Sequence, residues 1–192
     1  MNNNVSKLAH SAIFAALCFV SFTYLQIKIP VPGGDFTSIH FGNIFLVVAS
    51  LLLGGFYGGL AGAVGMTIAD LMDPVYILVA PKTFILKFCI GLIVGLVAHK
   101  LKHIDQSNDR AYVTRWAIIA SICGMGFNVI ADPLFGYFYK MYVLGQPQEM
   151  AQALAKISAG ATLFNAVVTV ILANLIYTSL RPILKKAKLI NN

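Results

Sequence analysis

Residues 42–72 read GNIFLVVASLLLGGFYGGLAGAVGMTIADLM, and this stretch decides the fold. The tract is far longer than the roughly 20 apolar residues that one transmembrane helix needs. Gly54 and Gly55 stand near its middle. Because paired glycines are typical of turns, the tract is either one long helix or two short helices that fold back on each other. The rest of the chain decides between these alternatives.

The composition is that of a membrane protein. The 192 residues are 58% hydrophobic and only 11% charged, whereas soluble globular proteins have roughly 25% charged residues. In a bilayer the backbone must satisfy its own hydrogen bonds, which leaves helix bundles or closed barrels. The apolar tracts are long and do not alternate with period two, so helices are favoured. We therefore predict an all-α membrane protein with one domain, residues 1–192.

Four other apolar tracts complete the prediction. They are residues 7–27, 82–101, 115–143 and 159–182. The first is too long for the apolar part of a signal peptide, so we interpret it as a retained helix. If residues 42–72 form two helices, the bundle has six transmembrane helices and both termini lie on one side of the membrane.

The basic residues support six helices. Nine then lie on the side of the termini, and they are Lys7, Lys100, Lys102, Arg110, Arg115, Arg181, Lys185, Lys186 and Lys188. The other side keeps five, namely Lys28, Lys82, Lys87, Lys140 and Lys156. Since cytoplasmic loops carry an excess of Lys and Arg, both termini are predicted to be cytoplasmic. The same rule explains the net charge of +7, so we expect no nucleic-acid partner.

The connecting segments differ in character. Residues 28–41 contain two prolines and paired glycines, which predict an irregular loop. Residues 145–158, GQPQEMAQALAKIS, are more polar and are expected to form a short external helix or lid.

Small residues recur at the spacing that lets helices pack closely in lipid. Ala12 and Ala16 lie four apart, with Ala9 on the preceding turn, and similar glycines are Gly58, Gly62, Gly65, Gly91 and Gly95. These residues either pack within the bundle or form a docking face for a membrane partner. The first helix is the better candidate for docking.

Ionisable and amide side chains inside apolar tracts are costly, so they often mark function. They are Asp70, Lys87, Asn128, Asp132 and Asn165. In the six-helix arrangement all lie at a similar depth on the outer side. They form either a binding pocket or a structural ion pair between Lys87 and one of the two aspartates. The tyrosines at 137, 139 and 142 are either interfacial anchors or ring-stacking groups.

No motif indicates catalysis. The four histidines lie at span ends or in loops, and the sequence has neither HExxH nor a P-loop. The cysteines at 18, 89 and 123 share no metal-binding spacing. We expect no enzyme activity, metal or cofactor. Two alternatives stay open: a stand-alone secondary transporter or channel that uses Asp132 and Lys87 as an ion or proton relay, and a membrane-embedded enzyme.

The chain resembles the substrate-binding S components of energy-coupling factor (ECF) vitamin transporters. The resemblance rests on the size, the helix pattern, the Ala12-x-x-x-Ala16 motif and IHFGNIFLVVASLLLGGFYGGLAGAVGMTIADL at residues 39–71. It implies capture of a vitamin from outside and docking on a transmembrane T component with two ABC ATPases. Docking would use the first-helix alanines Ala9, Ala12 and Ala16.

The resemblance also implies which residues contact the ligand. They lie in the first loop, the connection after the third helix and the outer halves of the last three helices: Asp35, His40, Asn43, Asp70, Lys82, Lys87, Asn128, Asp132 and Asn165. A pocket with such groups suits a small polar heteroaromatic ring. Pyridoxine-like or hydroxymethylpyrimidine-like ligands fit best, with riboflavin, folate and cobalamin open.

Overall fold

The computed structural model describes residues 3–31 and 35–187, with side chains described for 5–31 and 36–187. The elements in chain order are α1 (Asn3–Tyr24), β1 (Gln26–Val31), β2 (Asp35–His40), α2 (Gly42–Leu53), α3 (Gly55–Met72), α4 (Ala80–Gly95), α5 (Arg110–Phe138) and α6 (Gln148–Lys186). A 3-10 turn at Ile77–Val79 precedes α4, and π-helical turns at Leu96–Leu101 and Tyr139–Val143 extend α4 and α5.

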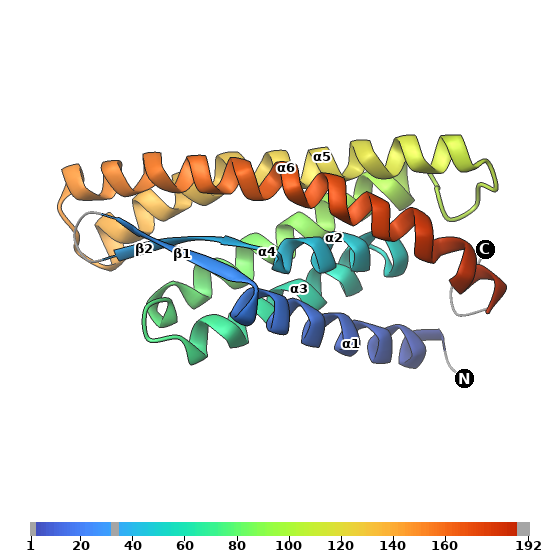
Figure 1. Cartoon of the computed structure of the whole chain (residues 1–192), viewed down its shortest axis with the longest axis horizontal. Helices are drawn as coiled ribbons and strands as arrows, with labels where there is room; N and C mark the ends of the chain where they lie inside the picture. The colour runs from blue at the N-terminus through green and yellow to red at the C-terminus, as the bar shows by residue number, and fades with distance from the viewer. Residues whose placement is uncertain (1–2, 32–34, 188–192) are drawn as a thin grey trace.

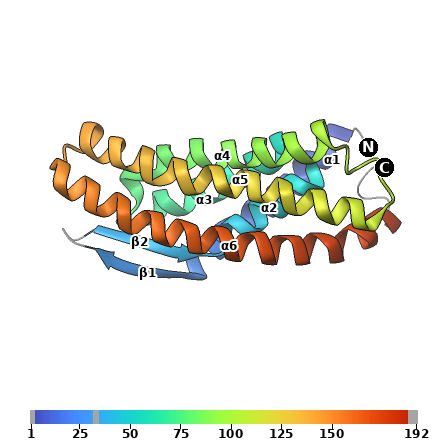
Figure 2. The same ribbon diagram turned by 90° about the horizontal axis from the view of Figure 1, so that it is seen from above.

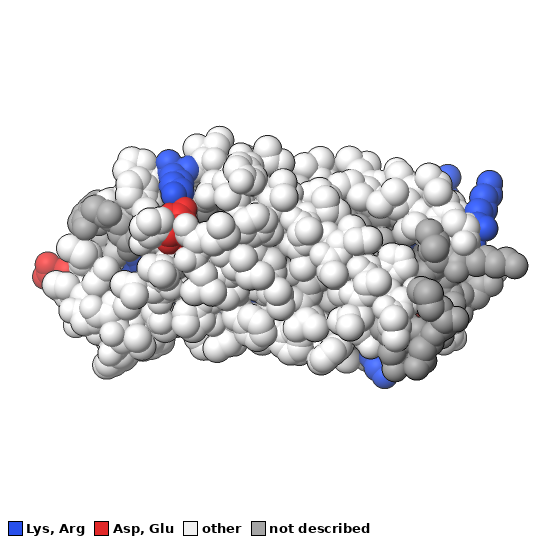
Figure 3. All heavy atoms as spheres, turned by 90° about the horizontal axis from the view of Figure 1, so that it is seen from below, with Lys and Arg blue, Asp and Glu red and all other residues white. Residues whose placement is uncertain are grey.

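The helices run roughly along one long axis (Figures 1 and 2). The start of α1, the end of α6 and the connection between α4 and α5 lie together, and we call this the terminal end. The α3–α4 and α5–α6 connections lie at the opposite end, which we call the hairpin end because the β1–β2 hairpin extends toward it. Figure 3 shows charged side chains near both ends of one face and none across its middle, as a membrane-embedded surface requires.

The predicted turn at Gly54-Gly55 is confirmed. Gly54 has φ of +92°, a conformation that glycine adopts without steric cost, and it joins α2 to α3. A Cβ on Gly58 would stand 2.3 Å from the backbone of Ser50 in α2, and one on Gly91 would stand 2.2 Å from Cα of Gly59. The glycines of α3 and α4 therefore permit close helix packing, as predicted.

The helical character of the chain is confirmed, but the expectation of an irregular first loop was wrong. Residues there form an antiparallel pair in which Gln26 faces His40 and Val31 faces Asp35. The sequences QIKIPV and DFTSIH are rich in β-branched and aromatic residues, which favour strands. The prolines had suggested an irregular loop, but a two-stranded ribbon has an unpaired edge on each strand where proline is tolerated.

The expectation of a separate external helix at 145–158 was also wrong. The segment from Gln148 onward is the first part of α6, which continues without a break to Lys186. Ala, Gln, Glu, Leu and Lys are good helix formers, and no proline separates residues 148–158 from the apolar part of the helix. Ala151 and Leu154 are buried, so this polar segment packs against the bundle.

Four helical segments in the described part of the chain are long and apolar enough to cross a membrane: Val5–Tyr24, Ile77–Leu101, Arg110–Val143 and Gln148–Lys186. Helix α2 is apolar but has only 12 residues, which is about 18 Å at ~1.5 Å per residue. That length is shorter than a hydrocarbon core of about 30 Å.

Candidate functional site

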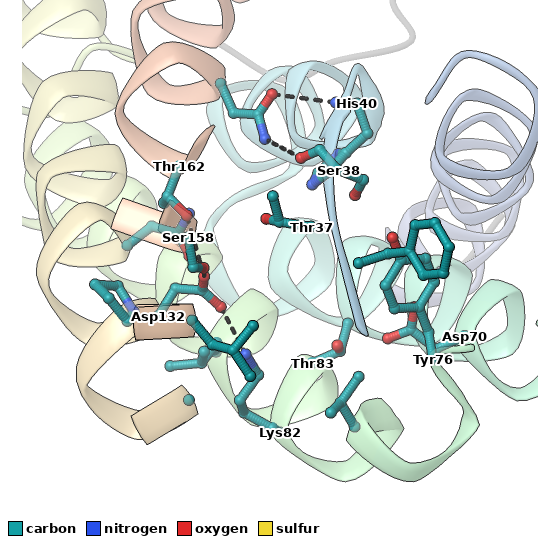
Figure 4. Close-up of a pocket in the computed structure, with 18 of the residues that line it drawn as sticks. Thr37, Ser38, His40, Asp70, Tyr76, Lys82, Thr83, Asp132, Ser158 and Thr162 are labelled. Carbon is teal, nitrogen blue, oxygen red and sulfur yellow. Dashed lines mark hydrogen bonds and ion pairs between the residues drawn. The ribbon is translucent and has the colours of Figure 1, made fainter. Parts of the chain in front are cut away.

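A cavity opens at the hairpin end between β2 and helices α3, α4, α5 and α6. Seven of the nine predicted ligand-contacting residues line it: His40, Asp70, Lys82, Lys87, Asn128, Asp132 and Asn165. They come from five separate elements. The sequence predicted that these polar side chains lie at a similar depth in the membrane. The fold brings them around one cavity. Figure 4 shows Asp132 with Ser158 and Thr162 across the cavity from Asp70 and Tyr76.

Asp132 is the centre of a hydrogen-bond network that joins three helices. Its Oδ1 accepts from Lys82 Nζ of α4 at 2.9 Å. Its Oδ2 accepts from Ser158 Oγ and Thr162 Oγ1 of α6, both at 3.0 Å. The structural ion pair that the sequence suggested for Lys87 is therefore formed by Lys82 instead. Both oxygens of this carboxylate are already bonded within the protein.

Asn165 fastens strand β2 to helix α6. Its Oδ1 accepts from the backbone N–H of His40 at 3.1 Å, and its Nδ2 donates to the carbonyl of Ser38 at 3.0 Å. The His40 ring is buried and packs edge-to-face on Phe22 at 4.5 Å between centroids. Burial, reinforced by the positive charge of Lys87, lowers the pKa of His40 to about 3. The imidazole is therefore neutral at pH 7.

Asp70 and Lys87 are buried charges of the cavity wall that do not pair. Asp70 is 1% exposed and Lys87 is 7% exposed. Among the described residues, neither has an opposite charge within 4.0 Å. Neither oxygen of Asp70 has a hydrogen bond of good geometry there, although Thr83 lies close to it. An unpaired buried charge is costly unless a partner satisfies it.

Among the predicted site residues whose side chains the structure describes, one is not brought to the cavity. Asn43 is fully buried at the start of α2 and does not line it. Asp35 pairs through its backbone with Val31, and its side chain lies outside the described residues, as does Lys188.

The tyrosines at 139 and 142 line a separate apolar groove between α4 and α5 rather than the cavity. This placement fits the interfacial interpretation of these aromatic residues.

Sequence reasoning missed several cavity residues. The missed aromatic residues are Phe22, Phe36 and Tyr76, and the missed hydroxyl residues are Thr37, Ser38, Thr83, Ser158 and Thr162. A signal existed for two of them. Ser158 and Thr162 precede Asn165 by seven and three residues, so all three lie on one face of a helix. The described residues contain no cluster of His, Cys, Asp and Glu that could hold a metal ion.

Comparison with known proteins extends this description. Residues 2–182 match the model of a protein family described as ECF-type riboflavin transporter, S component. A solved structure described as ThiT from Listeria monocytogenes covers 98% of both chains with a TM-score of 0.66 and 19% identity; this similarity shows a shared fold. An uncharacterized protein from Pyrococcus woesei is 34% identical over 76 residues, which is 40% of this chain and 49% of that protein. The match therefore spans about half the length of that relative.

Proposed function

Because the chain belongs to the family of ECF-type riboflavin transporter S components, we propose that it captures a small heteroaromatic B vitamin at the outer face of the membrane. It delivers this vitamin to an ATP-driven energy-coupling factor module. Members of the family are membrane-embedded substrate-binding subunits for vitamin uptake rather than enzymes. The observation that carries the proposal is the cavity at the hairpin end, with two unpaired buried charges in its wall.

The cavity has the character of a small-molecule site. Its wall combines apolar and aromatic side chains with a few convergent polar groups, which is the usual composition of ligand pockets. Phe22 and Tyr76 supply aromatic surface for a flat ring. Asn128 Oδ1 and His40 Nδ1 are buried and without hydrogen-bond partners among the described residues. A polar ring with short hydroxyl-bearing arms would satisfy both.

We propose six membrane crossings with both termini in the cytoplasm. In this arrangement α2 and α3 count as two of the six helices, although α2 alone is shorter than the hydrocarbon core. The terminal end holds the larger number of Lys and Arg residues, in agreement with the positive-inside rule. The hairpin end then faces outward, so the cavity receives its ligand from outside. The seven predicted residues that line the cavity stay in the proposal, whereas Asn43 does not line it and the side chain of Asp35 lies outside the described residues.

Helix α1 supports the docking proposal because one side of it packs on α3 while alanines on another side are exposed. The backbone of α1 at Ala15 lies against α3, since the Ala15 carbonyl oxygen would stand 2.2 Å from a Cβ on Gly65. Ala9, Ala12 and Ala16 are exposed instead. A face of small side chains allows close approach of another membrane helix. We propose that the T component, which works with two ABC ATPases, packs against this face.

Riboflavin is a second candidate for the ligand because the family description names it. The stand-alone transporter is less favoured, since Asp132 is bonded to Lys82, Ser158 and Thr162 and is poorly placed to relay ions.

The test is vitamin uptake into cells that express this chain with or without the T component and the ATPases. We expect uptake only when all partners are present, and we expect Ala12→Leu to reduce uptake while vitamin binding is unchanged. Gly126→Leu is the matched control, because a Cβ at this position of α5 would meet nothing within 4 Å. Full uptake by the lone chain, or normal uptake by Ala12→Leu, would contradict the proposal.

A further inference from the structure

Five charged residues line the cavity: Asp70, Lys82, Lys87, Asp132 and Lys140. Lys140 is not assigned to the ligand, and the other four divide into a pair within salt-bridge distance and a pair beyond it. Lys82 and Asp132 neutralise each other at 2.9 Å. Asp70 of α3 and Lys87 of α4 line the same cavity, yet no nitrogen–oxygen distance between them is 4.0 Å or less. Both are more than nine-tenths buried. Asp70 and Lys87 therefore present to the contents of the cavity one negative and one positive side chain that have no ion-pair partner among the described residues.

A ligand that satisfies both groups needs complementary charges on one small ring. A neutral ring could give Asp70 an N–H donor and Lys87 a carbonyl acceptor, but each contact would then involve only one charge. Contacts in which both partners are ionised are shorter and stronger. They also remove the cost of leaving an ammonium and a carboxylate buried without counter-charges. The arrangement therefore favours a ring that is itself a zwitterion.

We infer that the cavity selects a 3-hydroxypyridine ring, the ring of the pyridoxine class, whose protonated nitrogen donates to Asp70 and whose ionised oxygen accepts from Lys87. This inference rests on the proposed function and specifies its ligand. In water near neutral pH such a ring carries the hydroxyl proton largely on its nitrogen, so it has both charges at once. Aminopyrimidine and flavin rings are neutral under these conditions and lack this complement.

The remaining wall fits the substituents of such a ring. Hydroxymethyl arms can donate to Asn128 Oδ1 and hydrogen-bond with His40 Nδ1, which have no partner among the described residues. Phe22 and Tyr76 provide apolar surface for the ring. In this proposal Asp132 does not contact the ligand. It is a positioning residue that holds Lys82, Ser158 and Thr162 in place.

The experiment is calorimetric titration of the detergent-purified chain with three ligands. The first is pyridoxine, the second is its analogue without the 3-hydroxyl group, and the third is its analogue with carbon in place of the ring nitrogen. We expect pyridoxine to bind at least roughly ten- to hundredfold more tightly than either analogue, because loss of the hydroxyl group or of the ring nitrogen leaves the ring neutral and weakens the contacts with both Asp70 and Lys87.

Two variants assign the contacts. Asp70→Asn and Lys87→Gln should each reduce the preference for pyridoxine over both analogues, because each variant removes one of the two charged contacts that only the zwitterionic ring can make. A purely structural role would weaken all three ligands equally. Glu149→Gln and Lys156→Gln are exposed controls with the same charge changes. If a variant fails to fold, the relative affinities of the wild-type chain for the three ligands still test the inference.

Equal affinity of the wild-type chain for all three ligands would overturn the inference. Binding of riboflavin or another neutral vitamin, with no binding of pyridoxine, would overturn it while leaving vitamin capture intact. Failure to bind any vitamin of a broad panel would overturn both the inference and the proposed function.

Discussion

Replacement of Asp132 by alanine tests the network that holds the cavity together. The change leaves the Lys82 ammonium, 15% exposed in its side chain, without its partner at 2.9 Å. It also removes the acceptor of Ser158 and Thr162. Removing one member of a buried pair costs about 3–5 kcal/mol. Because both members keep some contact with solvent, we expect a loss of roughly 2–4 kcal/mol of unfolding free energy.

The assay is thermal unfolding of the purified protein in detergent. At roughly 2–4 °C per kcal/mol for a chain of this size, Asp132→Ala should lower the Tm by roughly 5–15 °C. The double variant Lys82→Met/Asp132→Leu should lose less unfolding free energy than the sum of the losses of its two single variants, with a coupling of at least ~1 kcal/mol.

Lys28→Met is the matched control. Its pair with Asp73, at 2.5 Å, is 35% exposed on the lysine side, so its loss should cost at most about 1 kcal/mol. Equal effects of Lys82→Met and Lys28→Met, or additive single changes, would refute the reasoning.

Three further predictions concern other parts of the molecule. Asn165→Ala should weaken vitamin binding roughly tenfold and speed hydrogen exchange at the His40 amide, because it frees strand β2; unchanged exchange would contradict this role. Gly91→Leu should prevent correct assembly, since its Cβ would meet Gly59 Cα at 2.2 Å, whereas Gly126→Leu should be tolerated; a normal yield of folded Gly91→Leu would refute the close packing. Burial lowers the pKa of His40 in the folded chain to about 3, so on acidification the imidazole is protonated in the unfolded chain before it is protonated in the folded chain. The unfolding free energy should therefore fall as the pH drops below about 6.5, by up to ~1.4 kcal/mol per pH unit. His40→Gln should reduce that slope, and an unchanged slope would show that His40 is not its source.

Much of the helical arrangement could be predicted because it depends on local signals. Gly54-Gly55 interrupts an apolar tract, and only a glycine readily adopts the φ of +92° found at this turn. The depth of Asp70, Lys87, Asn128 and Asp132 followed from helix rise alone, and the structure places all four around one cavity.

The pairing of charges could not be predicted in the same way. Lys82 and Lys87 both lie in the N-terminal half of α4, but they are five positions apart and so point about 140° apart on the helix. Helix rotation and tilt decide which lysine reaches Asp132, and these depend on packing with α5 and α6. The partners Ser158 and Thr162 were missed because residues 145–158 were expected to form a separate element.

The β1–β2 hairpin was missed because the two prolines and paired glycines of residues 28–41 were interpreted as signals of an irregular loop. Its stability depends on contacts from elsewhere, above all the two hydrogen bonds from Asn165 of α6. A contact over this sequence separation gives no periodic signal in a single chain.

The most direct test of vitamin capture is mass spectrometry of the small molecules that remain bound after the detergent-purified chain is incubated with an equimolar panel of B vitamins. We predict that the wild-type chain retains one vitamin near a 1:1 ratio, and that Asp70→Asn and Lys87→Gln retain much less of it while Glu149→Gln retains as much. A folded wild-type chain that retains no vitamin would contradict the account.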